Sequence, residues 1–481
     1  MGSGPGGLQI SYSLSRLGIK HAVISADPSP GGMFRRWPFF QRLLSWTKPY
    51  APFDRGTREY ERYDWNSLLA DQPEHRALMT TVMDGSSNYP SRPEMERNLA
   101  TFVERTGLAI RFGCRWTATR RDGDRWTIET TDGDFRCQVP IFAVGVAEPW
   151  RPDVPGIADI PHYADTRPAD TYAGHRVFII GKENSAFELA SGLLQWARQL
   201  VLASPSPTKL SINTRTLVGV RARYVQPYED HVLAGGVLVL DASIERLERT
   251  ENLCRVHTRK SDGSGELVFE ADDVIATTGF TSPLQDLVKL GVATVGRNKL
   301  PAQTAFWESS SLPGLYFGGT INQASPGLRK HGIPSNSGGN NGYRYNARIL
   351  ARRIAEKHFG IAPERPTVAK NEVVPYLLRE VTTAPELWHQ KAYLCRVLVR
   401  DERRGIVDDG ILPLQHFIDA GPPDGVAATL EVNPAGDIYP MLYMRKGGVT
   451  TEHALTPNPL HDFRTREHER AMVAALEGLL L

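Results

Sequence analysis

Gly2-Ser3-Gly4-Pro5-Gly6-Gly7, at the start of the chain, decides the fold. A helix-compatible run to Leu17 follows, and then Gly18 and a strand-like segment over 19–25. This order is typical of the turn, helix and second strand of a βαβ unit that binds a nucleotide. Gly2 suits the tight turn, Gly4 lets the backbone approach a pyrophosphate, and Gly7 allows the helix to pack closely on the strand. The helix start offers free N–H groups and a partial positive charge to phosphates.

One strand of this unit is missing from the sequence. A strand should precede the glycine turn and lie in the middle of the sheet, but only Met1 stands before Gly2. We therefore expect the native polypeptide to begin upstream, by roughly 6–12 residues if that strand has ordinary length. Mass spectrometry of the native N-terminus tests this expectation.

A second unit of the same plan begins near Arg176. The apolar run 177–180 suits a buried parallel strand, the turn 181–186 follows it, and a helix is predicted over 187–199. Each unit is followed by short alternating segments joined by Asp-Gly turns, which predict a β-meander. The meanders end in strands over 141–145 and 274–279. The repetition predicts two dinucleotide sites.

The predicted fold class is α/β, with two Rossmann-like dinucleotide-binding domains, each carrying a β-meander, and a small C-terminal α+β domain. The first domain is predicted over 1–168 and 283–360, with a helix over 343–357; the second is predicted over 169–282, and the C-terminal domain over 370–481. In the C-terminal domain we expect strands near 397–399, 427–432 and 439–444 and a helix over 467–480. No motif there indicates a role.

Composition limits the function classes. The chain has 481 residues, of which 41% are hydrophobic and 23% charged, and its net charge is +2. These values exclude a mainly disordered chain and give no basis for a nucleic-acid partner. The four scattered cysteines contain no Cys-x-x-Cys pair, which excludes a disulfide scaffold, a typical zinc site and a vicinal redox disulfide. No apolar run of membrane-spanning length is present, so we expect no membrane partner and a cytoplasmic protein.

Two βαβ units, two meanders and two strands that end in Ala-x-Gly or Ala-x-x-Gly resemble the two-dinucleotide-binding-domain flavoproteins over about residues 1–360. Within them, the chain resembles the flavin-containing monooxygenases and their N-hydroxylating and Baeyer–Villiger relatives. The resemblance implies FAD in the first unit and NADPH in the second. The implied FAD contacts and strand-end contacts are Gly2, Gly4, Pro5, Gly6, Gly7, Gly31, Gly32, Met33, Trp37, Gly145, Gly279, Gly319 and Thr320.

Two residues are candidates for the chemistry itself. Asn66 resembles the monooxygenase asparagine that faces the flavin, where its amide could hydrogen-bond an oxygenated flavin; the alternative is a loop-capping role. Arg92 could bind a substrate carboxylate or the nicotinamide side, or pair with a surface acid. The segment 329–331, Arg-Lys-His, could also bind a substrate carboxylate, or it is an exposed basic loop.

The resemblance also assigns the second cofactor. Gly181, Asn184 and Ser185 match the family pattern at the NADPH pyrophosphate, with Glu183 in place of the middle glycine. No acid follows the next strand, so NADPH is preferred over NADH. The residues available there for the 2′-phosphate are Ser204, Ser206, Lys209 and Arg215.

Three further positions depart from the family pattern. Ser25 stands where an acid normally binds the adenosine ribose, with Asp27 two residues later. Thr320 replaces the aspartate that usually follows Gly319. His162 ends an incomplete version of the monooxygenase fingerprint. The gap before the histidine is longer here than in the family pattern, and the leading aromatic residue is absent.

The resemblance implies an FAD-dependent, NADPH-using monooxygenase that inserts one oxygen atom of O₂, through a flavin hydroperoxide, into a small nucleophilic substrate. N-hydroxylation of an amine or amino acid is favoured because no clear Baeyer–Villiger fingerprint is present. Two alternatives remain open: an NAD(P)H-dependent flavin oxidoreductase that passes electrons to another acceptor, and a non-catalytic nucleotide-binding module. The expected partners are the small substrate and O₂, and self-association into a homo-oligomer is left open.

Overall fold

The computed structural model describes residues 1–37, 42–214, 219–228, 230–231, 236–296 and 298–480. Internal contacts divide the chain into two compact units. The first unit comprises Met1–Gly32, Ser45–Val146 and Ser282–Leu481, and the second comprises Met33–Leu44 and Ala147–Thr281. The N-terminal glycine turn and the C-terminal residues therefore belong to the first unit, whereas the turn after residue 180 belongs to the second.

Two short parallel strand pairs form the centre of the first unit. They are β1 (Val23–Ile24) with β2 (Ile110–Arg111), and β6 (Ile141–Phe142) with β17 (Tyr316–Phe317). The N–H of Gly2 donates to the carbonyl oxygen of Ile24 at 2.8 Å, and the carbonyl oxygen of Met1 accepts from the N–H of Ala143 at 2.8 Å. The first two residues thus hydrogen-bond to β1 on one side and to the end of β6 on the other.

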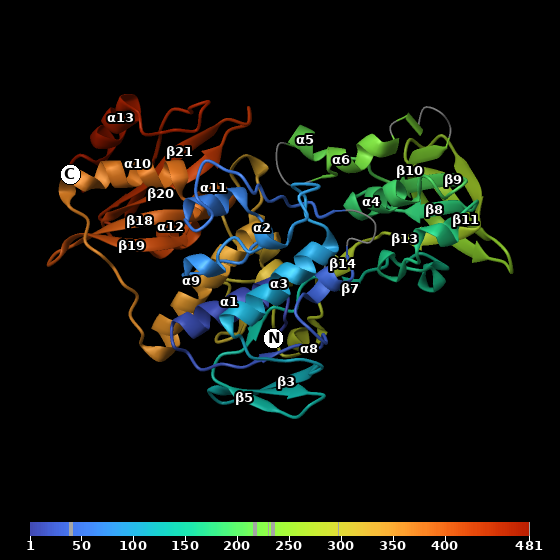
Figure 1. The fold of residues 1–481 in the computed structure, drawn as a ribbon, viewed down its shortest axis with the longest axis horizontal. Coiled ribbons are helices and arrows are strands. Elements are labelled where there is room, and N and C mark those ends of the chain that lie inside the picture. Colours follow the sequence, from blue (N-terminus) through green and yellow to red (C-terminus); the bar gives the residue numbers. More distant parts are fainter. Residues whose placement is uncertain (38–41, 215–218, 229, 232–235, 297, 481) are drawn as a thin grey trace. The chain divides into compact units, whose positions relative to one another are not determined.

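The helices α1 (Pro5–Arg16) and α9 (Asn340–Phe359) pack against each other in the first unit (Figure 1). Proline suits the first position of α1 because its fixed φ is helical and its missing N–H would have no helical partner. Gly360 ends α9 in the left-handed conformation, at φ +66°, which glycine adopts without strain. Ile10 and Leu350 lie in the same buried apolar core.

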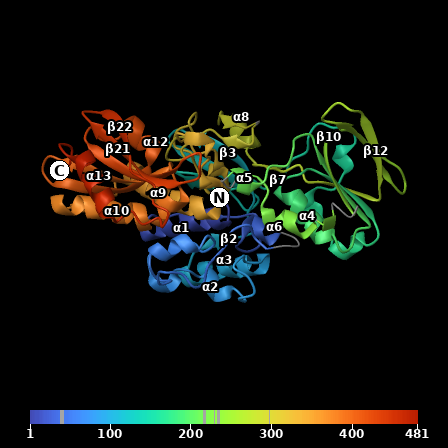
Figure 2. The same ribbon diagram turned by 90° about the horizontal axis from the view of Figure 1, so that it is seen from above.

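The third long helix of the first unit, α3, begins at a capping box. The Ser91 side chain accepts from the backbone N–H of Glu94, and the Glu94 side chain accepts from the backbone N–H of Ser91. Figure 2 shows α2 and α3 side by side. Besides α3 (Arg92–Thr106), the first unit contains the smaller elements α2 (Met79–Val82), α8 (Gln285–Lys289), the meander β3 (Trp116–Asp122), β4 (Arg125–Thr130) and β5 (Phe135–Cys137), and the pair β15 (Thr294–Val295) and β16 (Leu300–Pro301).

The C-terminal part of the first unit contains a five-stranded antiparallel sheet in the order β19-β18-β20-β21-β22. Its strands are largely buried and alternate poorly, as expected for a sheet with helices packed against it. The strands are β18 (Leu394–Asp401), β19 (Gly405–Pro413), β20 (Gly425–Val432), β21 (Ile438–Lys446) and β22 (Val449–Ala454). The helices are α10 (Val373–Thr383), α11 (Pro385–His389), α12 (Leu414–Ala420) and α13 (Arg466–Leu476).

The second unit is built on a six-stranded sheet in the order β12-β11-β10-β9-β8-β13. The strands β8, β9, β10 and β13 run parallel, and β10, β11 and β12 form the antiparallel meander. The strands are β8 (Arg176–Ile180), β9 (Gln199–Ser204), β10 (Val237–Arg249), β11 (Cys254–Lys260), β12 (Glu266–Ala271) and β13 (Asp273–Ala276). The other elements are α4 (Asn184–Leu193), α5 (Ser211–Thr214), α6 (Ala222–Val225) and the pair β7 (Glu148–Pro149) and β14 (Phe280–Thr281).

The α/β prediction with two meanders is confirmed. Several elements differ in extent from the prediction, among them the helix expected over 467–480, which ends at Leu476, and the strand expected over 141–145, which is reduced to Ile141–Phe142. The strand expected over 19–25 is reduced to Val23–Ile24, and the helix expected over 187–199 lies at Asn184–Leu193, because Gln199 already begins β9. The predicted domain boundaries stay a prediction; the contacts place 147–168 with the second unit and 370–481 with the first.

Two features are absent from the residues that the structure describes. No helix among them is long and apolar enough to cross a membrane. In the same part of the chain, no group of three or more His, Cys, Asp or Glu side chains could hold a metal ion.

Candidate functional site

The turn before α1 is so tightly packed that only glycine fits at several positions. A Cβ added to Gly7 would lie 1.9 Å from the carbonyl oxygen of Gly2. A Cβ added to Gly6 would lie 2.3 Å from the Cα of Gly319, and Gly2 itself has φ +105°. The predicted close helix–strand packing at Gly7 is therefore present. It fixes where α1 starts relative to the strands.

Gly4 differs from its neighbours because it faces open space. A Cβ added there would meet only the Cα of Gly32, at 4.0 Å, and its φ of −70° suits any residue. The N–H of Gly31 donates to the carbonyl oxygen of Ser3 at 3.1 Å, which brings the second glycine pair against the turn. Gly4 is the N-cap of α1 and no side chain caps it. Free helix N–H groups beside open backbone are what a dinucleotide pyrophosphate requires, so these residues fit the group.

The ribose end of this turn is held by hydroxyl groups. The Ser25 and Ser3 hydroxyl groups hydrogen-bond at 2.7 Å, and the backbone N–H of Asp27 donates to the Ser25 hydroxyl at 3.2 Å. Ser25 is buried, whereas Asp27 is half-buried. The serine at the usual acidic position therefore braces the turn, and the Asp27 carboxylate lies 3.4 Å from the Ser25 hydroxyl.

The late glycine pair lies directly against α1. A Cβ added to Gly318 would lie 2.2 Å from Cδ1 of Ile10, and Gly319 has φ +75°. Thr320 forms a side-chain hydrogen bond with buried Tyr343 of α9; burial raises the pKa of the Tyr343 hydroxyl and this bond opposes the shift. The predicted Gly319-Thr320 site and the start of α9 thus join the N-terminal turn in one place. Gly145, after β6, adopts φ +74°.

Asn66 is buried and its amide is engaged by the protein. Its side-chain oxygen accepts from the Ser45 hydroxyl, and its side-chain nitrogen donates to the Thr47 hydroxyl at 3.0 Å. Its backbone carbonyl accepts from the side chain of Asn340, at the start of α9, at 2.9 Å. The geometry corresponds to the loop-fixing alternative considered for this residue. A contact between the Asn66 amide and the flavin stays a prediction.

Arg92 is the first residue of α3 and forms an i,i+4 pair with Glu96, with 3.5 Å between nitrogen and oxygen. Both side chains are about one-third exposed, at 33% and 38%. In the basic segment 329–331, Lys330 pairs with Glu431 at 3.3 Å and also with Glu452. Lys330 is therefore already neutralised by two carboxylates, which the sequence did not indicate.

Met33 and Trp37 belong to the second unit. Trp37 is buried, and its ring lies 4.7 Å from that of Phe280 and 6.5 Å from that of Tyr163. Met33 packs against the same apolar cluster. The aromatic stretch after Gly32 thus supplies core packing, and the buried indole nitrogen of Trp37 has no hydrogen-bond partner among the described residues.

The second turn is braced by side chains. A Cβ added to Gly181 would lie 2.3 Å from the Thr277 hydroxyl. Asn184 donates to the carbonyl oxygen of Gly219 at 3.0 Å and accepts from the backbone N–H of Arg221 at 3.1 Å. Ser185 follows within the first turn of α4, and Gly279 has φ +95° beyond β13. This arrangement leaves the α4 N-terminus without a side-chain cap.

An ion pair beside this turn was not foreseen. Buried Lys182 pairs with Asp241 of β10, whose backbone is in register with Ser204 at the end of β9. An acid therefore does lie beside the end of β9, contrary to the sequence expectation, because it comes from the neighbouring strand.

Lys209 interacts electrostatically with Glu183, which lies exposed at the start of α4. Arg215 lies outside the described residues.

The C-terminal part packs on the start of α9. Gln390 donates to the Ser337 hydroxyl at 2.9 Å and to the side-chain oxygen of Asn346 at 2.8 Å. His389 is buried, and its Nδ1 lies 3.4 Å from the side-chain nitrogen of Asn341. Burial lowers the pKa of His389, and nearby Arg344 lowers it further, so the imidazole is neutral. The C-terminal domain therefore fixes the segment that enters α9.

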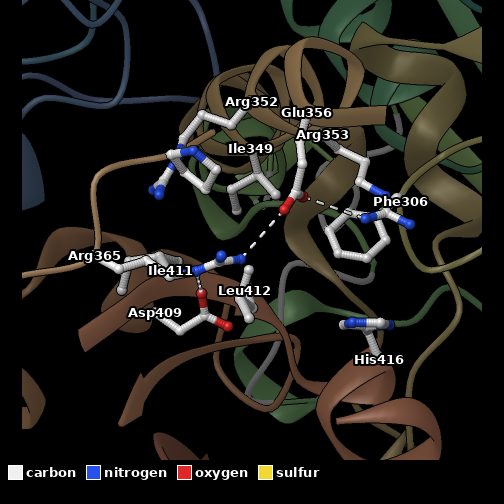
Figure 3. Close-up of a pocket in the computed structure, with 11 residues that line it drawn as sticks. Phe306, Ile349, Arg352, Arg353, Glu356, Arg365, Asp409, Ile411, Leu412 and His416 are labelled. Carbon is white, nitrogen blue, oxygen red and sulfur yellow. Dashed lines mark hydrogen bonds and ion pairs between the residues drawn. The ribbon is translucent and has the colours of Figure 1, made fainter. Parts of the chain in front are cut away.

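A cavity of about 120 Å³ lies between the second half of α9, β19 and α12 (Figure 3). Glu356 joins Arg353 at 3.4 Å and Arg365 at 3.3 Å, and Arg365 also pairs with Asp409. The guanidinium of Arg353 lies 4.9 Å above the ring of Phe306. None of the predicted site residues lines this cavity. The charged side chains that line this cavity largely neutralise one another, whereas the helix N-termini after the two glycine turns have no capping side chain.

Comparison with known proteins agrees with this geometry. The family model described as pyridine nucleotide-disulphide oxidoreductase matches residues 1–319. The mouse FAD-dependent oxidoreductase domain-containing protein 2 is 26% identical over 440 residues, covering 84% of this chain and 64% of the relative. The chain thus spans less than two thirds of that relative.

Two solved structures have a similar fold. Bacillithiol disulfide reductase from Staphylococcus aureus has a TM-score of 0.57 and 17% identity, over 74% of this chain and 97% of that one. A flavin-containing monooxygenase from Stenotrophomonas maltophilia has a TM-score of 0.55 and 20% identity, over 74% of this chain and 96% of that one. At these identities the likeness describes the fold.

Proposed function

The chain belongs to the pyridine nucleotide-disulphide oxidoreductase family, and we propose that it is an NADPH-dependent flavin monooxygenase acting on a small amine or amino acid. As a member of this family it is an oxidoreductase that uses FAD and NAD(P)H. The observation that carries the proposal is the pair of uncapped glycine turns, combined with cysteines unsuited to thiol chemistry. A non-catalytic module does not agree with the family.

The residues that would hold FAD are those of the first turn. Gly4, Gly31 and Gly32 would pass along the pyrophosphate, Asp27 would bind a ribose hydroxyl, and Thr320 would face the ribityl chain. When bound, the flavin supplies the redox chemistry and the reaction with O₂. The protein's own tasks are to bind, to orient and to exclude water.

Buried polar groups near the start of α9 carry out the orienting task. The Asn340 side chain donates to the carbonyl oxygens of Trp65 and Asn66, and Arg344 donates to the carbonyl oxygen of Ser67 at 2.7 Å. The uncapped N-terminus of α9 presents a partial positive charge, which stabilises negative charge placed before it. Since these groups are buried, they are fixed before any ligand arrives.

The cysteines favour oxygen chemistry over disulfide reduction. All four are free. Burial raises the pKa of the Cys137 thiol to about 11 and raises the pKa values of Cys254 and Cys395 as well. Because the thiolate is the reactive form, these thiols are poor redox nucleophiles near neutral pH.

The choice of nitrogen as the oxygenated atom rests on His162. This histidine ends the incomplete fingerprint; it is fully buried, and both of its ring nitrogens form hydrogen bonds. Its Nε2 lies 3.0 Å from the carbonyl oxygen of Gly279, and its Nδ1 accepts from the N–H of Ala164 at 3.2 Å. A histidine held in this way stabilises the loop, and together with the incomplete Baeyer–Villiger fingerprint this makes carbonyl oxygenation the less favoured reaction.

NADPH is proposed over NADH because Lys182 neutralises Asp241. A free Asp241 carboxylate beside the end of β9 would bind a 2′-hydroxyl and repel a 2′-phosphate, but its pairing with Lys182 removes that repulsion. Ser204 and Lys209 remain available as hydroxyl and cation for the phosphate.

A flavin oxidoreductase that passes electrons to another acceptor is the second candidate. The engaged amide of Asn66 favours it, because an amide already bonded to Ser45 and Thr47 has limited capacity for an oxygenated flavin.

The two candidates differ in where the oxygen goes. We expect the purified flavoprotein to oxidise NADPH faster when a suitable small amine is added, and to place one atom of isotopically labelled O₂ in the product. Hydrogen peroxide release should fall as product forms. Fast NADPH oxidation with an artificial electron acceptor, with no labelled product from any amine tested, would favour the second candidate.

A further inference from the structure

Trp388, in α11, lies among two cations and an imidazole. The indole is buried and its N–H donates to the carbonyl oxygen of Thr382 at 2.9 Å. The guanidinium carbon of Arg62 lies 3.4 Å from the centroid of the Trp388 ring, and the Lys391 ammonium lies 5.3 Å from it. The imidazole of His461 lies 5.2 Å from the same ring, centroid to centroid. Arg62, Lys391, His461 and Trp388 are called the Trp388 cluster below.

The Trp388 cluster contains no counter-charge. Within the described residues, no carboxylate forms an ion pair with Arg62, Lys391 or His461. The acids on the neighbouring segments are already bound: Glu386 of α11 pairs with Arg58 at 2.8 Å, and Asp462 pairs with Arg464 at 2.9 Å. Like charges that lie close together without a nearby acid repel one another, so we expect another interaction to offset this repulsion.

The hydrogen-bonding capacity of the cluster is also largely unused. The Lys391 ammonium donates to the carbonyl oxygen of Trp388, and Arg62 donates to the carbonyl oxygen of Thr382 at 3.4 Å. A guanidinium has five N–H donors and an ammonium has three. Among the described residues, most of these donors have no acceptor, and His461 accepts and donates no side-chain hydrogen bond. The donors come from three separate segments and converge on one indole.

Burial and mutual repulsion act on the protonation of the cluster. Burial lowers the pKa of Lys391 to about 8, and Arg62 contributes to that shift. Burial also lowers the pKa of His461, with smaller contributions from Arg62 and Lys391. Burial lowers the pKa of Arg62 as well, and Tyr63 opposes that shift. An anion placed among these groups would reverse the shifts, since it favours their charged forms.

The backbone beside the cluster is held in an unusual conformation. His461 has φ +56° and Ala392, next to Lys391, has φ +59°, and neither residue is glycine. The N–H of His461 donates to the carbonyl oxygen of Asn458, and the N–H of Ala392 donates to that of Leu430. Left-handed non-glycine residues persist where the surroundings enforce them, and they gather at binding sites. The convergence of the cations is therefore imposed by the fold.

We propose that the Trp388 cluster binds a small tetrahedral oxyanion, either a free phosphate or sulfate ion or the phosphate group of a monoester. Arg62 presents several donors in one plane, which suits bidentate contact with two oxygens, and Lys391 acts as a point charge. Donors from three segments can serve three or more oxygens. A planar carboxylate offers two oxygens and is the weaker match.

The test uses the full flavoprotein and sulfate, because sulfate keeps the same charge between pH 6 and 9. Isothermal titration at constant ionic strength, with chloride as the balancing anion, should show saturable binding at one site. Inorganic phosphate and glycerol phosphate are tested next; tighter binding of glycerol phosphate identifies a monoester as the ligand, and equal binding identifies the free ion. Binding of acetate as strong as that of sulfate would overturn the tetrahedral assignment.

Variants and pH locate the site. Arg62→Gln and Lys391→Gln should each weaken sulfate binding by at least tenfold, whereas Lys370→Gln, which removes an exposed lysine from the same domain, should leave it unchanged. In the unmodified protein the affinity for sulfate should fall as the pH rises through about 8, where Lys391 loses its proton. Equal binding by Arg62→Gln and the unmodified protein, or affinity independent of pH between 7 and 9, would overturn the proposal.

Discussion

The two glycine turns of this chain, before α1 and before α4, are stabilised by different kinds of contact. The turn before α1 is held by backbone against backbone: Gly7 against Gly2, and Gly6 against Gly319. The turn before α4 has Gly181 against the Thr277 hydroxyl, and it relies on polar side chains for the rest. The first turn therefore has no room for adjustment, whereas the second can yield where a side chain can move.

The difference explains why one turn keeps its glycines and the other does not. Glu183 stands in the second turn where the middle glycine is expected, and its side chain is exposed. Asn184 and the Lys182–Asp241 pair provide the bracing that backbone contacts provide in the first turn. Substitutions should accordingly be more damaging in the first turn than in the second.

The largest effect is expected for Gly7→Ala. The added Cβ would lie 1.9 Å from a backbone oxygen that cannot rotate away, so α1 must shift on the strands. We expect a loss of more than about 3 kcal/mol in the free energy of unfolding, together with loss of bound flavin. Chemical denaturation and the flavin content of the purified protein measure this. A variant as stable as the parent would show that α1 is not fixed by this contact.

A smaller effect is expected for Gly181→Ala. This residue has φ +135°, and an added Cβ would lie 2.3 Å from the Thr277 hydroxyl, which can move in part, and 2.9 Å from the backbone carbonyl oxygen of Thr277. We expect a loss of roughly 1–3 kcal/mol in the free energy of unfolding. The KM for NADPH should rise while the flavin content stays normal. Loss of flavin in this variant would contradict the separation of the two sites.

The smallest effect is expected for Lys182→Met, which leaves Asp241 without its partner. We expect the KM for NADPH to rise about tenfold, an effect of about 1.4 kcal/mol, and the KM for NADH to change less, because the carboxylate repels the 2′-phosphate. The double variant Lys182→Met/Asp241→Asn should recover most of the loss. Equal changes for both nucleotides would show that the pair does not set the preference.

The sequence was sufficient to predict the features that depend on neighbouring residues. The glycine turns, the Asp-Gly hairpins and the apolar strand 177–180 follow from local conformational preferences. Strand 19–25 was predicted too long because pairing with β2 extends over just two residues, Val23 and Ile24.

Features that join distant segments were missed. Lys182 and Asp241 are 59 positions apart, and Asp241 reaches the site through the register of β10 with β9. The Trp388 cluster gathers Arg62, Lys391 and His461, which no local pattern connects. The role of Asn66 depended in the same way on Ser45 and Thr47, which are remote enough to be invisible in a motif.

The variant Gly4→Ala tests most directly whether the first turn is a cofactor site. Gly4 has an ordinary φ of −70°, and an added Cβ would meet only the Cα of Gly32, at 4.0 Å, so the protein itself should tolerate alanine. We predict an unchanged free energy of unfolding for the flavin-free protein and an FAD affinity at least about tenfold weaker. Gly56→Ala, whose Cβ would make an ordinary 3.4 Å contact with Pro73, is the control and should bind FAD normally. Undiminished FAD affinity in Gly4→Ala would contradict the account.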